Sequence, residues 1–123
     1  MATTLITIQI QTTVDGVSIT IPANTATITH AAVGHIEGTF ATSDTAAVIP
    51  QGNVTPEVLY VRNMSAVATE FIDIMNDTAV LTRLDPGMQA VLDVSQVGTP
   101  ASNLKAKANT GKTPVLQYFI VGA

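Results

Sequence analysis

The fold of this chain is decided near its start by the stretch Leu5-Ile6-Thr7-Ile8-Gln9-Ile10-Gln11, followed closely by Val17-Ser18-Ile19-Thr20-Ile21. Apolar and polar residues alternate in both, and this period of two predicts two half-buried β-strands. Asp15-Gly16 lies between them. This pair is the strongest short indication of a hairpin, because both residues of such a turn need positive φ. We therefore predict that the first two strands pair in antiparallel fashion.

Shorter strands are predicted along the rest of the chain, although the pattern is looser at first. Between residues 26 and 40 the alternation is interrupted by Gly34 and Gly38. This predicts either one strand with a bulge or two short strands. Residues 41–56 are rich in Thr, Ser, Ala, Gly and Pro, and we expect a connection there with at most a short strand around Val48.

The second half is more regular, with apolar runs separated by turn residues. Six runs are predicted to be strands, namely Val58–Arg62, Glu70–Met75, Val80–Leu84, Met88–Val94, Leu104–Ala108 and Val115–Val121. Turns are predicted at Asn63, Asn76-Asp77, Asp85-Pro86-Gly87, Gly98-Thr99-Pro100 and Asn109-Thr110-Gly111. The segment Ala66–Met75 also contains helix formers, but its alternation around Ile72 and Ile74 favours a strand.

The composition favours β structure as strongly as the pattern does. Val, Ile and Thr make up 44 of the 123 residues, whereas Lys, Arg, Asp and Glu make up 14, and β-branched side chains pack well in strands. About eight or nine short strands without a convincing helix predict an all-β fold, an antiparallel β-sandwich of jelly-roll-like form. We expect one sandwich domain over residues 1–123, with residues 1–4 as a candidate extended arm.

Charge, cysteine content and hydropathy exclude several partner classes. The net charge is −4, so nucleic acid is not expected as a partner, since phosphate binding needs clustered Lys and Arg. One small cluster remains, formed by Lys105, Lys107 and Lys112. No cysteine is present, which excludes a disulfide, a thiolate zinc site and a Cys nucleophile. No run reaches the roughly 18 apolar residues of a membrane span. The first twenty residues lack Lys, Arg and the continuous apolar core of a secretory signal, and we expect a soluble protein with no membrane partner.

One short motif is similar to a phosphate-binding loop. Gly111-Lys112-Thr113 matches the end of such a loop, but the first glycine of the motif would fall at Ala106. Pro114 and an apolar strand follow in place of the required helix. Without a helix N-terminus there is no dipole or row of free N–H groups to hold the phosphate. We interpret the motif as a plain hairpin turn.

The one grouping that suggests a metal site is His30, His35 and Glu37. On a strand, His35 and Glu37 share a face, while His30 points to the other face unless a bulge intervenes. A transition metal needs three or four converging ligands. We therefore expect these side chains to be surface or interface residues.

Other chemical motifs give no site. A serine hydrolase would need a Ser, His and acid that meet in space, and the glycine pattern of a nucleophile elbow is missing. Three glycosylation sequons begin at Asn53, Asn63 and Asn76, as chance predicts in a chain with 19 threonines. Turn-forming or solvated roles, and not a paired-carboxylate site, are expected for Asp73, Asp77, Asp85 and Asp93. We expect no catalytic, cofactor-binding or metal-binding residues, no enzyme activity and no cofactor.

Few charges are available to cover the surface. Only 11% of the residues are charged, against roughly 25% in typical soluble domains, so the exposed strand faces are expected to carry Thr, Gln, Ser and Ala. Edge strands are then poorly protected against pairing with other chains. Depletion of charge is also a property of buried interface cores. We interpret the chain as a protein that works against other protein surfaces.

A longer pattern covers about 60 residues, from Tyr60 to Val121. It consists of Tyr60–Ser65, Glu70–Ile74, Arg83–Leu92, Leu104–Thr110 and Leu116–Ile120. This order resembles the C-terminal half of small β-rich virion proteins of tailed bacteriophages. In those proteins an asparagine-bearing strand, a turn with leucine, proline or lysine, and glycine, an alanine-lysine-alanine strand and a tyrosine-bearing last strand recur in that order. The N-terminal half is similar only in being Thr-rich with an early hairpin.

The resemblance implies a capsid decoration or cement protein on the outer surface of the virion, made in the host cytoplasm. It implies a homo-oligomer, a trimer or dimer, with the major capsid protein as partner. Ala2–Thr4 would then be an arm that adds to a neighbour's sheet. Two alternatives stay open. One is a tail or head–tail connector protein, and the other is a small carbohydrate-binding module, which is disfavoured because Phe71, Tyr118 and Phe119 lie in apolar strands.

Overall fold

Strands account for every regular element of the chain, as its β-branched composition predicts. The computed structural model describes residues 2–30, 34–94 and 104–122, and these form ten strands and no helix. The strands are β1 (Ala2–Val14), β2 (Val17–His30), β3 (Gly34–Ala41), β4 (Ala47–Val48), β5 (Pro56–Asn63), β6 (Ile72–Asn76), β7 (Ala79–Leu84), β8 (Gln89–Asp93), β9 (Leu104–Ala108) and β10 (Val115–Gly122). The predicted all-β fold with antiparallel sheets is confirmed.

The first two strands form the predicted hairpin. Asp15 and Gly16 have φ angles of 50° and 77°, and Val14 pairs directly with Val17, as a two-residue turn of positive φ requires. The strands are longer than predicted, with 13 residues in β1 and 14 in β2. Residues 2–4 pair with residues 28–30. The expectation of an extended arm at residues 1–4 is therefore wrong for residues 2–4, because they belong to β1.

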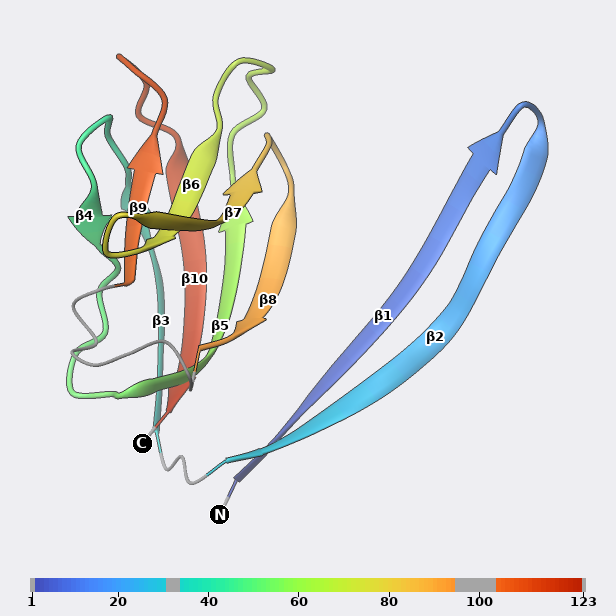
Figure 1. Ribbon diagram of the computed structural model, residues 1–123, viewed down its shortest axis with the longest axis horizontal. Helices are drawn as coiled ribbons and strands as arrows, with labels where there is room; N and C mark the ends of the chain where they lie inside the picture. Colours follow the sequence, from blue (N-terminus) through green and yellow to red (C-terminus); the bar gives the residue numbers. More distant parts are fainter. Residues whose placement is uncertain (1, 31–33, 95–103, 123) are drawn as a thin grey trace. The chain divides into compact units, whose positions relative to one another are not determined.

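The hairpin and the sandwich are two compact units of the chain (Figure 1). This corrects the expectation of one sandwich domain over residues 1–123. All the ladder partners of β1 lie in β2, and all those of β2 lie in β1. The sandwich itself is built from β3–β10 alone.

Two four-stranded antiparallel sheets make up the sandwich. One has the strand order β3-β10-β5-β8 and the other the order β4-β9-β6-β7. Of the connections between consecutive strands, only the one from β6 to β7 stays within a sheet, and each of the others crosses from one sheet to the other. The predicted short strand around Val48 is confirmed as β4. The looser segment 26–40 is divided between the end of β2, which runs to His30, and β3, so it forms neither one bulged strand nor two short strands of its own.

The core lies between the two sheets. Alternate residues of the strands point into it, for example Leu116, Tyr118 and Ile120 of β10. The remaining core residues come from both sheets and their connections, namely Ile49, Leu59, Val61, Ile72, Ile74, Leu84, Val94, Leu104 and Ala106. As the composition predicts, this core is mainly aliphatic.

The predicted boundaries are close to the observed ones in the second half. One clear difference lies in the ambiguous segment Ala66–Met75, where the strand begins only at Ile72. The preceding residues form a turn closed by the Glu70 N–H, which donates to the Val67 carbonyl. The predicted turn at Gly98-Thr99-Pro100 lies outside the described residues.

Candidate interaction surfaces

Exposed apolar residues of the hairpin form the first candidate surface. Ile8, Ile10, Val14, Val17 and Ile19 leave between 46% and 62% of their surface exposed. The strand alternation and the register of β1 with β2 place them on one face of the hairpin, together with the partly buried Ile6. We call this set, Ile6, Ile8, Ile10, Val14, Val17 and Ile19, the apolar ribbon face. Folding of the hairpin alone gathers these side chains without burying them.

Small polar side chains cover the opposite face of the hairpin. The hydroxyl oxygens of Thr7 and Thr25, which lie opposite each other, are 2.8 Å apart and share a hydrogen bond. Leu5 is exposed at 67% and lies on this side. We call the polar set the polar ribbon face, and its members are Thr7, Gln9, Gln11, Thr13, Ser18, Thr20, Thr25 and Thr27. The hairpin is thus amphipathic across its two faces.

The hairpin is nearly free of charge and has one irregularity. Asp15 in the turn is the single Asp, Glu, Lys or Arg between residues 2 and 30. The register shifts between Ile8 and Ile10, so that Pro22 and Ala23 lie opposite one residue of β1. Such a bulge tolerates proline, which has no N–H for the ladder. Neither ribbon face therefore carries a charged side chain.

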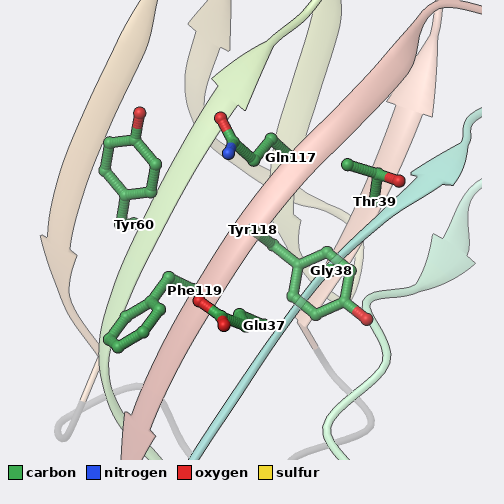
Figure 2. A pocket seen from close by; sticks show the side chains of 7 residues that line it. All are labelled: Glu37, Gly38, Thr39, Tyr60, Gln117, Tyr118 and Phe119. Atoms are coloured by element: carbon green, nitrogen blue, oxygen red, sulfur yellow. The ribbon is translucent and has the colours of Figure 1, made fainter.

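A hollow on the outer face of sheet β3-β10-β5-β8 is the second candidate surface. Its volume is about 660 Å³, and it is lined by Glu37, Gly38, Thr39, Tyr60, Gln117, Tyr118 and Phe119 (Figure 2). Tyr60 and Phe119 lie opposite each other on neighbouring strands. The Tyr60 hydroxyl donates to Gln89 Oε1 over 2.9 Å. The hollow combines two aromatic rings with amide and carboxylate groups, a donor set that could bind a polar organic ligand.

This hollow shows where sequence reasoning missed a surface residue. The run Val115–Val121 is apolar at nearly every position, so alternation cannot say which side chains face the core. The observed pattern buries Leu116, Tyr118 and Ile120 and turns Phe119 outward, where its ring stacks on His35 with 5.6 Å between ring centroids. The one indication in the sequence was the polar Gln117, which lies two residues before Phe119 and therefore on the same face of the strand.

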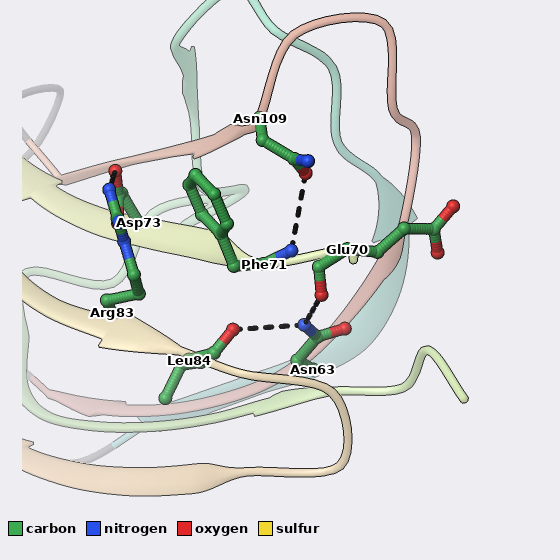
Figure 3. A network of polar contacts seen from close by, with 7 residues as sticks. All are labelled: Asn63, Glu70, Phe71, Asp73, Arg83, Leu84 and Asn109. Atoms are coloured by element: carbon green, nitrogen blue, oxygen red, sulfur yellow. Dashed lines mark hydrogen bonds and ion pairs between the residues drawn. The ribbon is translucent and has the colours of Figure 1, made fainter. Parts of the chain in front are cut away.

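Paired charges lie on the outer face of the other sheet. Asp73 stands between the core residues Ile72 and Ile74 and so points outward. Arg83 binds it through two nearly parallel hydrogen bonds, Nε to Oδ1 at 2.7 Å and Nη2 to Oδ2 at 3.0 Å. The guanidinium carbon lies 3.8 Å from the centroid of the Phe71 ring (Figure 3).

These contacts act on the charge of Arg83. The hydrogen bond to Asp73, helped by the charges of Asp73 and Asp85 and opposed by burial, raises the pKa of Arg83. The acids expected to be solvated or turn-forming are thus partly paired: Asp73 with Arg83, and Asp77, whose φ is 55° in a turn, with Lys105 at 3.3 Å.

A buried asparagine organises one end of the sandwich. The Asn63 side chain is fully buried and donates from Nδ2 to the carbonyls of Glu70 and Leu84, each over 3.0 Å (Figure 3). Its Oδ1 accepts the N–H of Ser65, and its backbone carbonyl accepts the Gly87 N–H. The side chain of Asn63 therefore holds the loop after β5 and the end of β7 together, and its backbone adds the turn before β8.

A second asparagine, Asn109, also forms hydrogen bonds with the backbone of a loop. Asn109 Nδ2 donates to the Thr69 carbonyl over 2.7 Å, and its Oδ1 accepts the Phe71 N–H over 3.3 Å. Asn63 and Asn109 both belong to the pattern that resembles phage virion proteins. In this chain these residues fix loops and turns, and the resemblance therefore rests on residues with structural roles.

The motif similar to a phosphate-binding loop and the lysine cluster both lie on or near the connection from β9 to β10. Gly111-Lys112-Thr113 forms a turn, with a Gly111 φ of 74° and a hydrogen bond from the Lys112 N–H to the Asn109 carbonyl. It joins β9 to β10, which lie in different sheets, so the expectation of a hairpin turn is corrected to a crossover turn. Of the lysine cluster, Lys105 pairs with Asp77, Lys107 lies opposite Asp73, and Lys112 lies in this turn.

The residues considered for a metal site belong to two different units of the chain. His35 and Glu37 share the exposed side of β3, as predicted, whereas His30 is the last residue of β2 in the hairpin unit. Within the described ranges, no three His, Cys, Asp or Glu residues lie close enough to bind a metal ion. The same part of the chain has no helix of the length and hydropathy needed to cross a membrane.

Comparison of the chain with protein-family models, curated protein sequences and solved structures found no match.

Proposed function

We propose that this chain is a capsid decoration (cement) protein of a tailed bacteriophage, which stabilises the head by binding over junctions of major capsid subunits. The observation that carries the proposal is the β1–β2 hairpin, which has one charged residue and exposes a row of Ile and Val side chains, the kind of surface from which an oligomer that lies on a protein shell can be built. Exposed apolar surface of this kind marks sites of contact with other proteins. The proposed location is the outer surface of the capsid, after synthesis in the host cytoplasm.

The setting in a phage particle is supported by the pattern of strands and turns between Tyr60 and Val121. Its asparagines, Asn63 and Asn109, and its Pro86-Gly87 turn fix the loops of the sandwich. A protein that shares these loop-fixing residues with virion proteins is expected to share their fold. This support concerns the fold and the setting, and no contact with the capsid is carried over residue by residue.

We also infer jelly-roll connectivity for the sandwich. The strand orders β3-β10-β5-β8 and β4-β9-β6-β7 result when an eight-stranded antiparallel ribbon is rolled up, so that the first strand lies beside the last. In this arrangement β3 pairs with β10 along eight residues. The first and last strands of the sandwich then lie side by side in one sheet. The loops that join the two sheets are left available for contacts.

The mechanism of such a protein is summed contact area and needs no chemistry. A stable protein interface buries about 1,200 to 2,000 Å² in total. Repetition of one interface over a closed shell adds the free energy of each contact, and a chain that bridges two capsid subunits gains further from the high effective concentration of its second contact. The low charge of the chain is compatible with wide contact against a protein surface.

The test is binding to phage heads that lack the chain. The purified full-length protein is added to such heads at micromolar concentration, the heads are pelleted, and bound copies are counted against the major capsid protein. We expect saturable binding, with hundreds of copies per head, and heads that resist heat or osmotic shock better than bare heads. Heads that bind no protein, or that bind it without saturation, contradict the proposal.

Copy number also separates the tail or connector alternative, which shares the virion setting. A connector or tail protein is present in tens of copies or fewer, and it assembles into rings or tubes. Localisation by particle reconstruction would place density for the chain on the shell if the proposal holds. Density confined to the neck or tail would favour the alternative.

A carbohydrate-binding module is the second candidate, and the hollow favours it. Tyr60 and Phe119 place two rings beside Glu37 and Gln117, and sugar sites combine aromatic platforms with polar groups. A glycan array with the full chain tests this function. Binding that is lost in Tyr60→Ala would support it, whereas Val115→Ala, at an exposed position of β10 that does not line the hollow, should have little effect.

A further inference from the structure

We propose that the apolar ribbon face of each chain is covered by the same face of other copies of this chain, so that the β1–β2 hairpin is a self-association element. The inference deepens the proposed function and rests on it for the biological setting only. Its physical argument concerns the isolated chain. It assigns a partner to the apolar ribbon face, whose extent across both strands is seen only from their register.

The hairpin as a unit requires such cover. A two-stranded hairpin is at best marginally stable in water, because it buries almost no apolar area. Here both strands are unusually long, at 13 and 14 residues. Among the described residues, the ladder partner of each is only the other strand, which leaves an outer edge on each strand with backbone N–H and C=O groups that no described ladder uses. Long, uncharged edges of this kind favour pairing with other strands.

The identity of the partner follows from charge and shape. The apolar ribbon face carries no charge, so a charged partner surface would lose hydration without gaining an ion pair. The same face of a second copy is uncharged and rich in Ile and Val. Rows of β-branched side chains on two such faces can interdigitate at the usual spacing of about 10 Å between packed sheets. Most oligomers of soluble proteins are symmetric and built from identical chains, so other copies of the chain are the natural cover for a surface that one copy leaves exposed.

The available area indicates how many copies are needed. The whole side of the hairpin that bears the apolar ribbon face is 13 residues long in β1, or about 40 Å at about 3.3 Å per residue, and two strands give a width of about 10 Å, so this side covers about 400 Å². Two faces together would then bury about 800 Å² and three about 1,200 Å², and the latter reaches the lower end of stable interfaces. We therefore expect three hairpins with their apolar faces turned toward a common axis.

Neighbouring residues of β1 provide a matched test. Thr12 lies opposite Ile19 on the apolar side, Thr13 lies opposite Ser18 on the polar side, and both are exposed. Because the chain has no cysteine, Thr12→Cys and Thr13→Cys each introduce a single thiol. Under mild oxidation we expect intermolecular disulfides to form in Thr12→Cys on the order of 100-fold faster than in Thr13→Cys, since only the former thiols share a high effective concentration. Equal rates would contradict the inference.

The molar mass of the full chain in solution is the second measurement, and it needs no cysteine variant. Light scattering of the full chain is expected to give about three times the 12.8 kDa of one chain. The double variant Ile8→Thr with Ile10→Thr keeps β-branched residues but removes apolar area, and should dissociate at concentrations where the control, Gln9→Thr with Gln11→Thr on the polar face, stays assembled. A wild-type chain that is monomeric at all concentrations would overturn the inference. So would a monomer whose Thr12→Cys thiol resists alkylation, because the chain would then cover the face itself.

These results are distinguishable from the test of the proposed function, because no phage head is present. A monomer that saturates heads would overturn self-association and leave the decoration role standing. An oligomer that ignores heads would do the reverse.

Discussion

Gly38 of β3 lies directly opposite Tyr118 of β10, and the Tyr118 hydroxyl oxygen is 2.7 Å from the position that a Cβ on residue 38 would take. The ring carbon that bears the hydroxyl lies 3.1 Å from the same position. The Tyr118 ring also packs edge-on against Phe40, with 6.0 Å between centroids. The absence of a side chain at Gly38 is thus what allows this buried ring to lie across the edge strand.

The first prediction is that Gly38→Ala destabilises the sandwich by about 1 to 3 kcal/mol, the usual cost of forcing an extra carbon into a packed site. Gly34→Ala on the same strand is the control, because its Cβ would meet only Val54 Cγ2 at an ordinary 3.6 Å. Urea denaturation measures both. Tyr118→Phe removes the nearest atom and should restore part of the stability of Gly38→Ala. Equal stability of the two alanine variants would contradict the role given to Tyr118.

A second prediction concerns the buried Asn63. Replacing it by Asp removes the amide donor and directs a carboxylate at the carbonyls of Glu70 and Leu84, which lose their partner. Leaving buried acceptors unsatisfied costs about 1 to 3 kcal/mol each, so we expect a loss of several kcal/mol and a large fall in melting temperature. Asn109→Asp changes the same chemistry at a more exposed position and should cost clearly less. Calorimetry measures the melting temperatures of both variants. A larger loss of stability in Asn109→Asp than in Asn63→Asp would show that Asn63 is not the main residue that fixes the loops.

The third prediction concerns the ion pair of Asp73 and Arg83. Asp73→Asn removes a negative charge that faces Arg83 and lies opposite Lys107, and should lower the melting temperature by a few degrees. Asp77→Asn, which removes a more exposed and less closely bound charge, should change it little. Because salt screens exposed charges, the difference between the two variants should shrink at high ionic strength. A difference that does not respond to salt would mean that the effect of Asp73 is not electrostatic.

Much of the sandwich could be predicted from local patterns, because its strands alternate cleanly and end at Asp, Asn, Pro and Gly. The run Leu104–Ala108 is an example, since Leu, Ala and Ala point inward while Lys105 and Lys107 point outward. The Asp15-Gly16 turn is another, because its conformation is set by two residues. Gly38 interrupts the alternation in the sequence, but only the structure shows that the Tyr118 ring lies close against it.

Other features could not be predicted because they depend on partners distant in the sequence. The ends of β1 and β2 are rich in Thr and lack clear alternation, and they extend as strands because each pairs with the other. Nothing local shows that the hairpin forms a unit apart from the sandwich. The outward position of Phe119 was hidden for a related reason, since β10 is apolar on both faces and only its pairing with β3 and β5 decides which face is inner.

The β1–β2 hairpin is proposed to be an assembly surface, which is stable when another protein surface covers it. Hydrogen–deuterium exchange of the full chain, measured across a dilution series, reports separately on β1–β2 and on the sandwich. We expect the amides of β1 and β2 to be protected at high concentration and to lose protection on dilution, while those of β5 and β10 stay protected throughout. Protection of β1 and β2 that is independent of concentration in a monomeric chain would contradict it.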